Sequence, residues 1–255
     1  MLVVTGSQSN VRAAYSSGTP AIGVGMGNVV TIIDETADLD DAAQKIQRSK
    51  CFDNATSCSS ENAVIVVDSV YDDCVRALQR VGGMLLDESQ TAHLIATHWR
   101  DGQLNRNMLA QNIDAVLGTL GMTDMAPQHT KFLIAPASGI GPNNPVSGEK
   151  MALFLALYRA TDFNDAKTKA RAIHDYQGRG HSLGLHSRDD KRAHELAMEM
   201  QACRIIVNQA HCFATGGSFD NGLPFSLSMG CGSWGGNSID CLLYTSDAAD
   251  ELTSG

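Results

Sequence analysis

The chain has 255 residues, 43% of them hydrophobic and 18% charged, which is the composition of a globular protein with one large or two small domains. Its formal net charge of −9 argues against nucleic acid or an anionic membrane surface as the main partner. No apolar run approaches the roughly 20 residues that span a bilayer, and the first residues do not resemble a signal peptide.

Strand-like and helix-like segments alternate along the chain, which predicts an α/β fold with a parallel or mixed sheet. The predicted strands are residues 1–4, 20–25, 29–34, 63–67, 131–135, 152–160, 181–187 and 203–208. The predicted helices are residues 11–18, 38–50, 71–83, 163–177 and 189–202, and the stretch from 84 to about 121 is expected to be mostly helical. Residues 38–50 are amphipathic, since Leu39, Ala42, Ala43 and Ile46 fall on one face.

The last 15 residues, 241–255 (CLLYTSDAADELTSG), differ in character from the rest of the chain. Back-translated, they resemble a sequencing-library transposase adapter read in frame, so we expect this segment to be a non-native tail. A genuine polar C-terminal tail is the alternative. Because the chain also begins inside a predicted strand, we expect it to be truncated at both ends.

The cysteines suggest reduced thiols and one reactive position. Seven cysteines without CxxC pairs favour a reducing cytoplasm over a disulfide framework, and no His or Cys pair has the spacing of a zinc site. In SKCFDNATSCSSENAVIVVD (49–68), Cys58 lies in a polar loop before a strand, whereas Cys51 ends a helix beside Phe52. A reactive cysteine needs exposure and donors for an oxyanion. Cys58 is therefore the candidate nucleophile, and a structural small residue is the alternative.

Four motifs, in this order, resemble the CoA-acylating branch of the aldehyde dehydrogenase superfamily. They are AAYSSGTPAIGVGMGN (13–28), SKCFDNATSCSSENAVIVVDSVYD (49–72), GRGHSLGLHS (178–187) and GCGSWGGNS (230–238). The resemblance implies an aldehyde dehydrogenase-like α/β fold with a partial cofactor-binding domain at 1–57 and a catalytic, thioester-forming domain at 58–234. It also identifies Cys58 with the family's nucleophile, the cysteine of an FDNxxxC(S/A)SE loop, which leaves Cys51 a packing role.

Gly23 stands where hydrolytic aldehyde dehydrogenases, by the same resemblance, carry the glutamate that activates water. Without that base, water should attack an acyl-enzyme slowly. A thiol can take the acyl group instead, because thiolates are strong nucleophiles. The resemblance therefore implies coenzyme A as co-substrate and argues against a hydrolytic enzyme. A glycine needed for its backbone freedom is the alternative explanation, and it can hold together with the loss of the glutamate.

The resemblance implies further contacts to NAD or NADP and to CoA. Gly6 and Ser7 match the turn beside the cofactor phosphates, with a capped helix start as the alternative. Glu149 matches the glutamate that binds the nicotinamide ribose, although Leu153 stands where the family often has proline; a surface glutamate is the plain reading. His181 matches a Gly-His near the active site and would orient or deprotonate the CoA thiol. A structural histidine is the alternative.

Residues 208–238 should line the acyl pocket by the same analogy, with Asn208 and His211 as candidate substrate contacts. Their hydrogen-bonding groups favour a small polar aldehyde, and the local sequence most resembles family members that act on sulfoacetaldehyde. Acetaldehyde and succinate semialdehyde remain alternatives, as does a catalytically inactive nucleotide-binding or scaffold protein. The resemblance also implies a homo-oligomer when intact, and we expect the 255-residue chain alone to be inactive.

Overall fold

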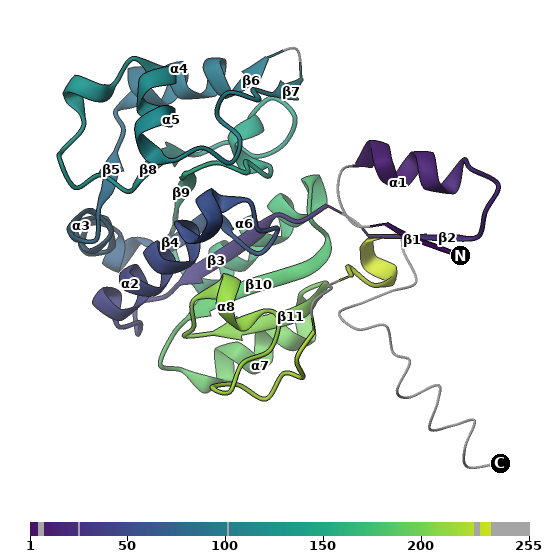
Figure 1. Ribbon diagram of the computed structural model, residues 1–255. Helices are drawn as coiled ribbons and strands as arrows, with labels where there is room; N and C mark the ends of the chain where they lie inside the picture. Colours follow the sequence, from purple (N-terminus) through teal and green to yellow (C-terminus); the bar gives the residue numbers. More distant parts are fainter. Residues whose placement is uncertain (5–7, 25, 101, 227–229, 236–255) are drawn as a thin grey trace.

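A seven-stranded, fully parallel sheet forms the centre of the molecule (Figure 1). The computed structural model describes residues 1–255 except 5–7, 25, 101, 227–229 and 236–255. The strand order is β11-β10-β3-β4-β9-β8-β5. The bounds are β3 (Val29–Ile33), β4 (Glu61–Val67), β5 (Gly83–Leu85), β8 (Phe132–Ala137), β9 (Phe154–Ala160), β10 (Gly180–His186) and β11 (Ala202–Val207). The predicted α/β class is confirmed.

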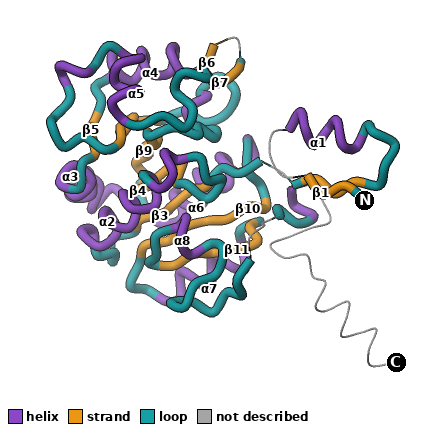
Figure 2. The backbone as a smooth tube through the Cα atoms, viewed as in Figure 1, coloured by secondary structure: helices purple, strands orange, loops and turns teal. Residues whose placement is uncertain are grey.

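Helices cover both faces of this sheet (Figures 1 and 2). On one face pack α2 (Leu39–Lys50) and α3 (Tyr71–Arg80), with the short α8 (His211–Ala214) beside α2. On the other pack α4 (Glu88–His98), α5 (Ile113–Leu120), α6 (Phe163–Tyr176) and α7 (Asp190–Glu199). A sheet buried on both faces explains why its strands read as continuous apolar runs.

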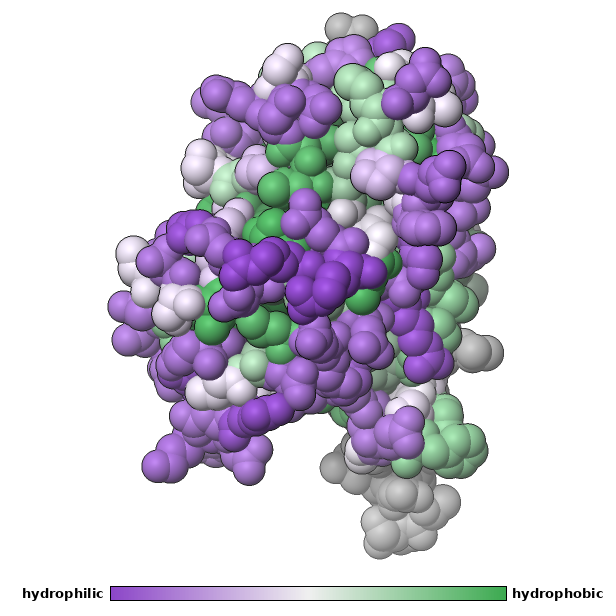
Figure 3. Space-filling view, turned by 90° about the vertical axis from the view of Figure 1, so that its left-hand side faces the viewer, coloured by the Kyte–Doolittle hydropathy of each residue, from purple (hydrophilic) through white to green (hydrophobic). Residues whose placement is uncertain are grey.

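The predicted helix at 38–50 shows how local sequence sets an element. Asp38 caps α2 by accepting a hydrogen bond from the Asp41 backbone N–H, which satisfies one of the otherwise unpaired donors of the first turn. Ala42, Ala43 and Ile46 are buried against the sheet, as their spacing predicts. Polar residues face outward, and Figure 3 shows polar side chains over most of one side of the molecule, with apolar residues between them.

A smaller unit at the start of the chain lies to one side of the main sheet (Figure 1). Strands β1 (Leu2–Val4) and β2 (Ala21–Gly23) pair in parallel, and α1 (Gln8–Tyr15) connects and covers them. Strand β3 and helix α2, which also precede residue 58, belong instead to the seven-stranded sheet layer. The main sheet therefore runs across the boundary expected at 57/58, and the division into two domains stays a prediction.

The region between α3 and β8 differs from the expected mostly helical stretch. It contains α4 and α5, but also strand β5 and a hairpin of β6 (Trp99–Arg100) and β7 (Gln103–Leu104). Strand β5 has three residues and owes its conformation to pairing with β8, so no periodic pattern could predict it. Short 3-10 helices complete the chain: η1 (Phe52–Ala55), η2 (Asp68–Val70), η3 (Thr123–Met125), η4 (Pro145–Ser147) and η5 (Ser233–Gly235).

Helices long and apolar enough to cross a membrane are absent from the part of the chain that the structure describes.

Candidate active site

Cys58 lies in the turn between η1 and β4, at the edge of the sheet where the strands begin. Three successive residues before it, Asp53, Asn54 and Ala55, have positive φ angles of 49°, 50° and 62°. Aspartate and asparagine tolerate this left-handed conformation better than most residues, which explains why they occur in the FDNA stretch. The Asn54 side chain donates to the Ala110 carbonyl oxygen at 3.1 Å and helps hold the strained loop. The loop presents Cys58 exposed to solvent.

Gly27 packs directly against Cys58. A Cβ atom at Gly27 would lie 2.7 Å from the Cys58 carbonyl oxygen and 2.9 Å from its Cβ, so only glycine allows this approach. The contact brings two of the four sequence motifs together, 13–28 and 49–72. The sequence reading of the first motif considered Gly23 and missed Gly27, because only the tertiary contact shows which glycine the Cys58 loop requires.

The Cys58 thiol is neutral at pH 7 in this state. Desolvation raises its pKa, and the negative charge of Glu149 raises it further, while a hydrogen bond with Ser59 lowers it. Cys51 is half-buried at the end of α2, and its Sγ approaches the Lys131 carbonyl oxygen at 3.8 Å. These positions fit the expected difference between an accessible Cys58 and a packing Cys51.

Glu149 lies within electrostatic reach of Cys58, which places two of the sequence-predicted site residues near each other. Its backbone N–H donates to the Gln177 side-chain oxygen at 3.0 Å, and this anchors the segment before β9. Desolvation raises the pKa of Glu149 to about 7, opposed by the charges of Lys150 and Lys50. Glu149 is therefore a half-buried carboxyl group that titrates near neutrality beside the candidate nucleophile.

Buried charged residues beneath this site were missed by the sequence reading. Lys50, Lys150 and Glu61 are each at most 1% exposed. Desolvation lowers the pKa of Lys50 to about 8, while the carboxylate of Glu61 opposes it. Lys150 donates from Nζ to the Gly148 carbonyl oxygen at 2.7 Å. Alternation of residue types cannot reveal such groups, since charged residues are rarely buried.

A bulge turns Glu61 toward α2 and α8. Val29 pairs with Glu61 but Val30 pairs with Ala63, so Asn62 is an extra residue in β4. Hydrogen bonds from the Ser49 side chain and the His211 backbone lower the pKa of Glu61, but desolvation outweighs them and raises it to about 7. The Asn62 side-chain oxygen accepts from the Lys150 backbone N–H at 3.1 Å, which ties β4 to the segment before β9.

His181 begins β10 at the same edge of the sheet as Cys58. One strand, β3, separates β4 from β10, so the starts of the two strands are about 10 Å apart. The ring is buried, with Nδ1 2.8 Å from the Ser182 hydroxyl and Nε2 without a hydrogen-bond partner among the described atoms. Burial lowers the pKa of His181 to about 4. A ring with so low a pKa is a weak base, which favours orienting a thiol over deprotonating it.

Three further contacts connect the His181 region with the Cys58 loop. The Cys231 carbonyl oxygen lies against Gly180, at a position that a Cβ atom would occupy. The Cys231 Sγ approaches the carbonyl oxygen of Met26, the neighbour of Gly27, at 4.0 Å. The side chain of Gln177 donates to the Met26 sulfur at 3.5 Å and also holds the Glu149 backbone. All four sequence motifs therefore meet at this edge of the sheet.

Asn208 and His211, the expected substrate contacts, take structural positions. The Asn208 side chain accepts from the Ser187 N–H at 3.0 Å and donates to the Ser187 carbonyl oxygen at 2.7 Å, just after the ends of β10 and β11. This is the edge opposite Cys58. His211 is 1% exposed, and its Nε2 is 2.8 Å from the Ser182 hydroxyl. These hydrogen bonds lend no support to a substrate contact, which stays a prediction.

The two remaining sequence-based assignments concern the start of the chain. Gly6 and Ser7 lie outside the described residues. Gly23 ends β2 under α1, where its N–H donates to the Tyr15 hydroxyl at 2.8 Å and a Cβ atom would collide with Val11. Close packing, and not an unusual backbone angle, accounts for this glycine. A glutamate side chain at this position would have to displace α1.

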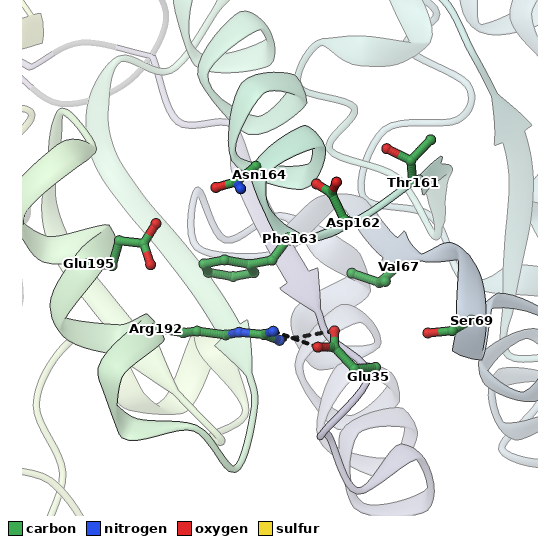
Figure 4. A pocket seen from close by; sticks show the side chains of 9 residues that line it. All are labelled: Glu35, Val67, Ser69, Thr161, Asp162, Phe163, Asn164, Arg192 and Glu195. Atoms are coloured by element: carbon green, nitrogen blue, oxygen red, sulfur yellow. Dashed lines mark hydrogen bonds and ion pairs between the residues drawn. The ribbon is translucent and has the colours of Figure 1, made fainter.

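A hollow lies at the opposite edge of the sheet, where β3, β4 and β9 end (Figure 4). Its volume is about 620 Å³. Figure 4 shows Arg192 paired with Glu35 and stacked on Phe163. The seven residues of β4 separate this hollow from Cys58 by roughly 20 Å. It is therefore not part of the Cys58 site. Groups of three or more His, Cys, Asp or Glu suited to a metal are absent from the described ranges.

Comparison with known sequences matches the Aldehyde dehydrogenase family over residues 1–222. A sulfoacetaldehyde dehydrogenase (acylating) from Cupriavidus necator is 52% identical over 239 residues, which are 94% of this chain and 48% of that protein. A sulfoacetaldehyde dehydrogenase (acylating) from Bilophila wadsworthia is 38% identical, over 93% of this chain and 52% of that protein. The chain thus spans about half the length of the curated relatives it matches.

Solved structures share this fold. An acetylating aldehyde dehydrogenase from Geobacillus thermoglucosidasius superimposes with a TM-score of 0.88 at 32% identity, over 94% of this chain and 52% of that one. The profile, the sequence relatives and the superposition agree with the meeting of the four motifs around Cys58. The chain belongs to the aldehyde dehydrogenase family.

Proposed function

We propose that the protein carrying this chain is a CoA-acylating aldehyde dehydrogenase that uses NAD or NADP. The observation that carries the proposal is the Cys58 loop itself: an exposed thiol on a strained loop, packed on Gly27 and near Glu149. Gly23 adds support, because the position expected for a water-activating acid has no side chain and is packed under α1. The names of the acylating relatives point the same way.

In the proposed reaction, the Cys58 sulfur adds to the aldehyde carbonyl and forms a thiohemiacetal. The backbone N–H of Cys58 would donate to the developing oxyanion. Bound NAD(P)+ supplies a hydride acceptor, and loss of the hydride and the hydroxyl proton leaves an acyl thioester on Cys58. The thiol of CoA then attacks the thioester, and Cys58 leaves as a thiolate that takes up the thiol proton. One proton is released per turnover.

Glu149 fits the role of a cofactor contact. Its half-buried carboxyl group lies within electrostatic reach of Cys58 and can accept hydrogen bonds from ribose hydroxyls. Gly6 and Ser7 remain proposed phosphate contacts by family resemblance. His181 is proposed to meet the CoA thiol, since its buried Nε2 is without a partner in the described structure.

We infer that the aldehyde is sulfoacetaldehyde. Support comes from the 52% identity to a sulfoacetaldehyde dehydrogenase, against 34% to a succinate-semialdehyde dehydrogenase (acetylating) from Clostridium kluyveri. Succinate semialdehyde and acetaldehyde are the competing substrates, and the ratio of their kcat/KM values decides among them. We further propose a cytoplasmic homo-oligomer, with a cofactor-domain remnant at 1–57 and a catalytic domain at 58–234. The described cysteines form no disulfide with one another, which is compatible with that location.

The decisive experiment uses the full-length protein, meaning this chain with any natural sequence that flanks it. NADH or NADPH formation is measured with sulfoacetaldehyde, with and without CoA, and the products are identified as acyl-CoA or free acid. We expect CoA-dependent reduction and acyl-CoA. Free acid formed without CoA would instead indicate a hydrolytic enzyme, and no reduction with any of the three aldehydes would indicate an inactive protein.

Cys58→Ala and Cys51→Ala form a matched pair for the same assay. We expect Cys58→Ala to abolish acyl transfer, because only this exposed thiol sits on a loop built to present it. Cys51→Ala should keep most of the activity, since Cys51 only packs at the end of α2. Equal losses in two variants that both fold would contradict the assignment of the nucleophile.

A further inference from the structure

One hydroxyl group joins two buried histidines next to the proposed CoA site. The Ser182 Oγ lies 2.8 Å from His181 Nδ1 and 2.8 Å from His211 Nε2. All three residues are at most 4% exposed. Ser182 and His181 are neighbours on β10, whereas His211 comes from α8, so the arrangement depends on α8 packing over the sheet. The chain of two hydrogen bonds ends at the His181 Nε2 atom, which has no partner among the described atoms.

The two hydrogen bonds couple the tautomers of the two rings. A hydroxyl group has one proton to donate, so Ser182 donates to one histidine and accepts from the other. Burial lowers the pKa of His181 to about 4 and that of His211 to about 3, so both rings are neutral at pH 7. In a neutral ring, one nitrogen is a donor and the other an acceptor. The direction of the Ser182 O–H bond therefore fixes which nitrogen of each ring carries hydrogen.

The unpartnered Nε2 of His181 points to a partner that arrives with a ligand. A buried polar atom left without a hydrogen bond costs free energy, and native proteins keep few of them. His181 lies at the edge of the sheet where Cys58 lies, and its neighbour Gly180 packs against the Cys231 segment, which also contacts Met26. A thiol hydrogen is the donor that the proposed acyl transfer brings to this place.

We propose that Ser182 and His211 are positioning residues for His181, and that their hydrogen bonds keep its Nε2 free as an acceptor for the CoA thiol. In this arrangement, His181 Nδ1–H donates to Ser182, Ser182 donates to His211 Nε2, and His211 carries its hydrogen on Nδ1. His181 stays neutral throughout, and the thiol proton ends on the Cys58 sulfur as the acyl group leaves it. The inference rests on the proposed function, and it replaces the substrate contact expected of His211.

The groups around the two rings keep them neutral. Burial is the main cause of the low pKa of His181, and the charges of His174 on α6 and Arg204 on β11 lower it further. Burial is also the main cause for His211, whose pKa is lowered further by His181, His186 and His174. The carboxyl group of Glu61 meets the backbone N–H of His211, and it is not among the groups that act on the His211 ring. An acidic side chain that would stabilise a charged imidazole is thus not among the groups acting on His181.

The first test is nitrogen NMR of the histidine rings in the 255-residue protein. We expect the 15N shifts to show hydrogen on Nδ1 of both His181 and His211, and Ser182→Thr, which keeps the hydroxyl, to preserve the pattern. Ser182→Ala should release His181 to the tautomer protonated at Nε2, the usual form of free histidine. A wild-type His181 that carries its hydrogen on Nε2 overturns the proposal, whatever the behaviour of the variants.

The second test isolates the CoA step in the full-length protein. Exchange of labelled CoA into an acyl-CoA needs Cys58 and the thiol site, but neither aldehyde nor NAD(P)+. We expect Ser182→Ala and His211→Phe to lower kcat for exchange by about 10- to 100-fold, with little change in KM, because a misplaced ring costs rate more than binding. Ser182→Thr should restore most of the rate.

Thr31→Val is the matched control, since Thr31 on the adjacent strand β3 also carries a buried hydroxyl, and its Oγ1 has no partner in the described structure. If Ser182→Ala exchanges CoA as fast as Thr31→Val, the positioning proposal is overturned, but the proposed function is not affected. If the wild-type protein exchanges CoA no faster than Cys58→Ala does, both the positioning proposal and the proposed function are overturned. If Ser182→Ala does not fold, the exchange rates of His211→Phe and Ser182→Thr decide the outcome.

Discussion

At the scale of single residues, the Glu149 carboxylate influences the titration of the Cys58 thiol. Each is partly desolvated, and the negative charge of Glu149 raises the pKa of Cys58. Before ligands bind, Cys58 is therefore a protonated and weakly reactive thiol. A positively charged nicotinamide ring placed nearby would favour the thiolate, which would couple activation of the nucleophile to cofactor binding.

Glu149→Gln should speed the alkylation of Cys58 by iodoacetamide at pH 8. Removing the negative charge lowers the pKa of the thiol, so a larger fraction is thiolate and the rate rises roughly two- to fivefold, the range of a partly solvated charge pair. Mass spectrometry of the Cys58 peptide measures the rate. Glu35→Gln, at the opposite edge of the sheet, is the control and should change nothing. A slower rate in Glu149→Gln would contradict the sign of the coupling.

At the scale of structural elements, the Gly27 loop and the Cys58 loop depend on direct backbone contact. We expect Gly27→Ala to lower the activity of the full-length protein by about 100-fold, because the new methyl group must push the Cys58 backbone away and small misplacements of reacting groups are costly. Steady-state kinetics with a check of Tm measures this. Gly118→Ala is the control, since a Cβ atom at that glycine meets no neighbour within 4 Å. Activity equal to this control would show that the contact does not position Cys58.

Helix α5 offers a second test at this scale, in its two nearby glycines. Gly118 is inside the helix with open space around it, so Gly118→Ala should raise the free energy of unfolding by about 0.5–1 kcal/mol. Gly121 ends the helix with a φ of 64°, so Gly121→Ala should lower it by about 1 kcal/mol. Urea denaturation of the 255-residue protein measures both. Changes of the same sign would contradict this assignment of the helix end.

At the scale of the whole molecule, buried titratable groups link stability to pH. Burial lowers the pKa of several histidines to about 4 or below: His98, His174, His181, His186 and His211. The unfolded chain binds protons at these positions near pH 6.5, so the folded state loses stability as the pH falls from 6.5 toward 4. Glu61 and Glu149 have raised pKa values of about 7 and act in the opposite direction between pH 7 and 4.5. The histidines outnumber the carboxyl groups.

We therefore expect the free energy of unfolding to fall by about 1–4 kcal/mol between pH 6.5 and 5.5. Urea denaturation of the 255-residue protein at several pH values measures this slope. His174→Gln should flatten it, because one buried titrating group is removed. His129→Gln, at an exposed position, should leave the slope unchanged. Stability that rises toward pH 5.5 would show that the carboxyl groups dominate.

The sequence by itself determined most of the main sheet and singled out Cys58 as the candidate nucleophile. Strand-like segments located β3, β4, β8, β9, β10 and β11, and most of them are rich in apolar residues because the sheet is buried on both faces. A polar loop before one of these strands located Cys58, since function concentrates in loops held by rigid elements. Both inferences, the strand positions and the loop position of Cys58, depend only on residues that are neighbours in the sequence.

Only the tertiary structure decided how the site is built. The closeness of Gly27 to Cys58, the turn of Glu61 by a bulge, and the bond between Ser182 and His211 each join residues far apart in the chain or depend on strand register. The same holds for β5, whose three residues are a strand because β8 pairs with them. His211 is an example: the sequence suggested a substrate contact, which stays a prediction, and only the packing of α8 shows that its ring lies buried against Ser182. Long-range packing and hydrogen bonding set these features, and no local pattern encodes them.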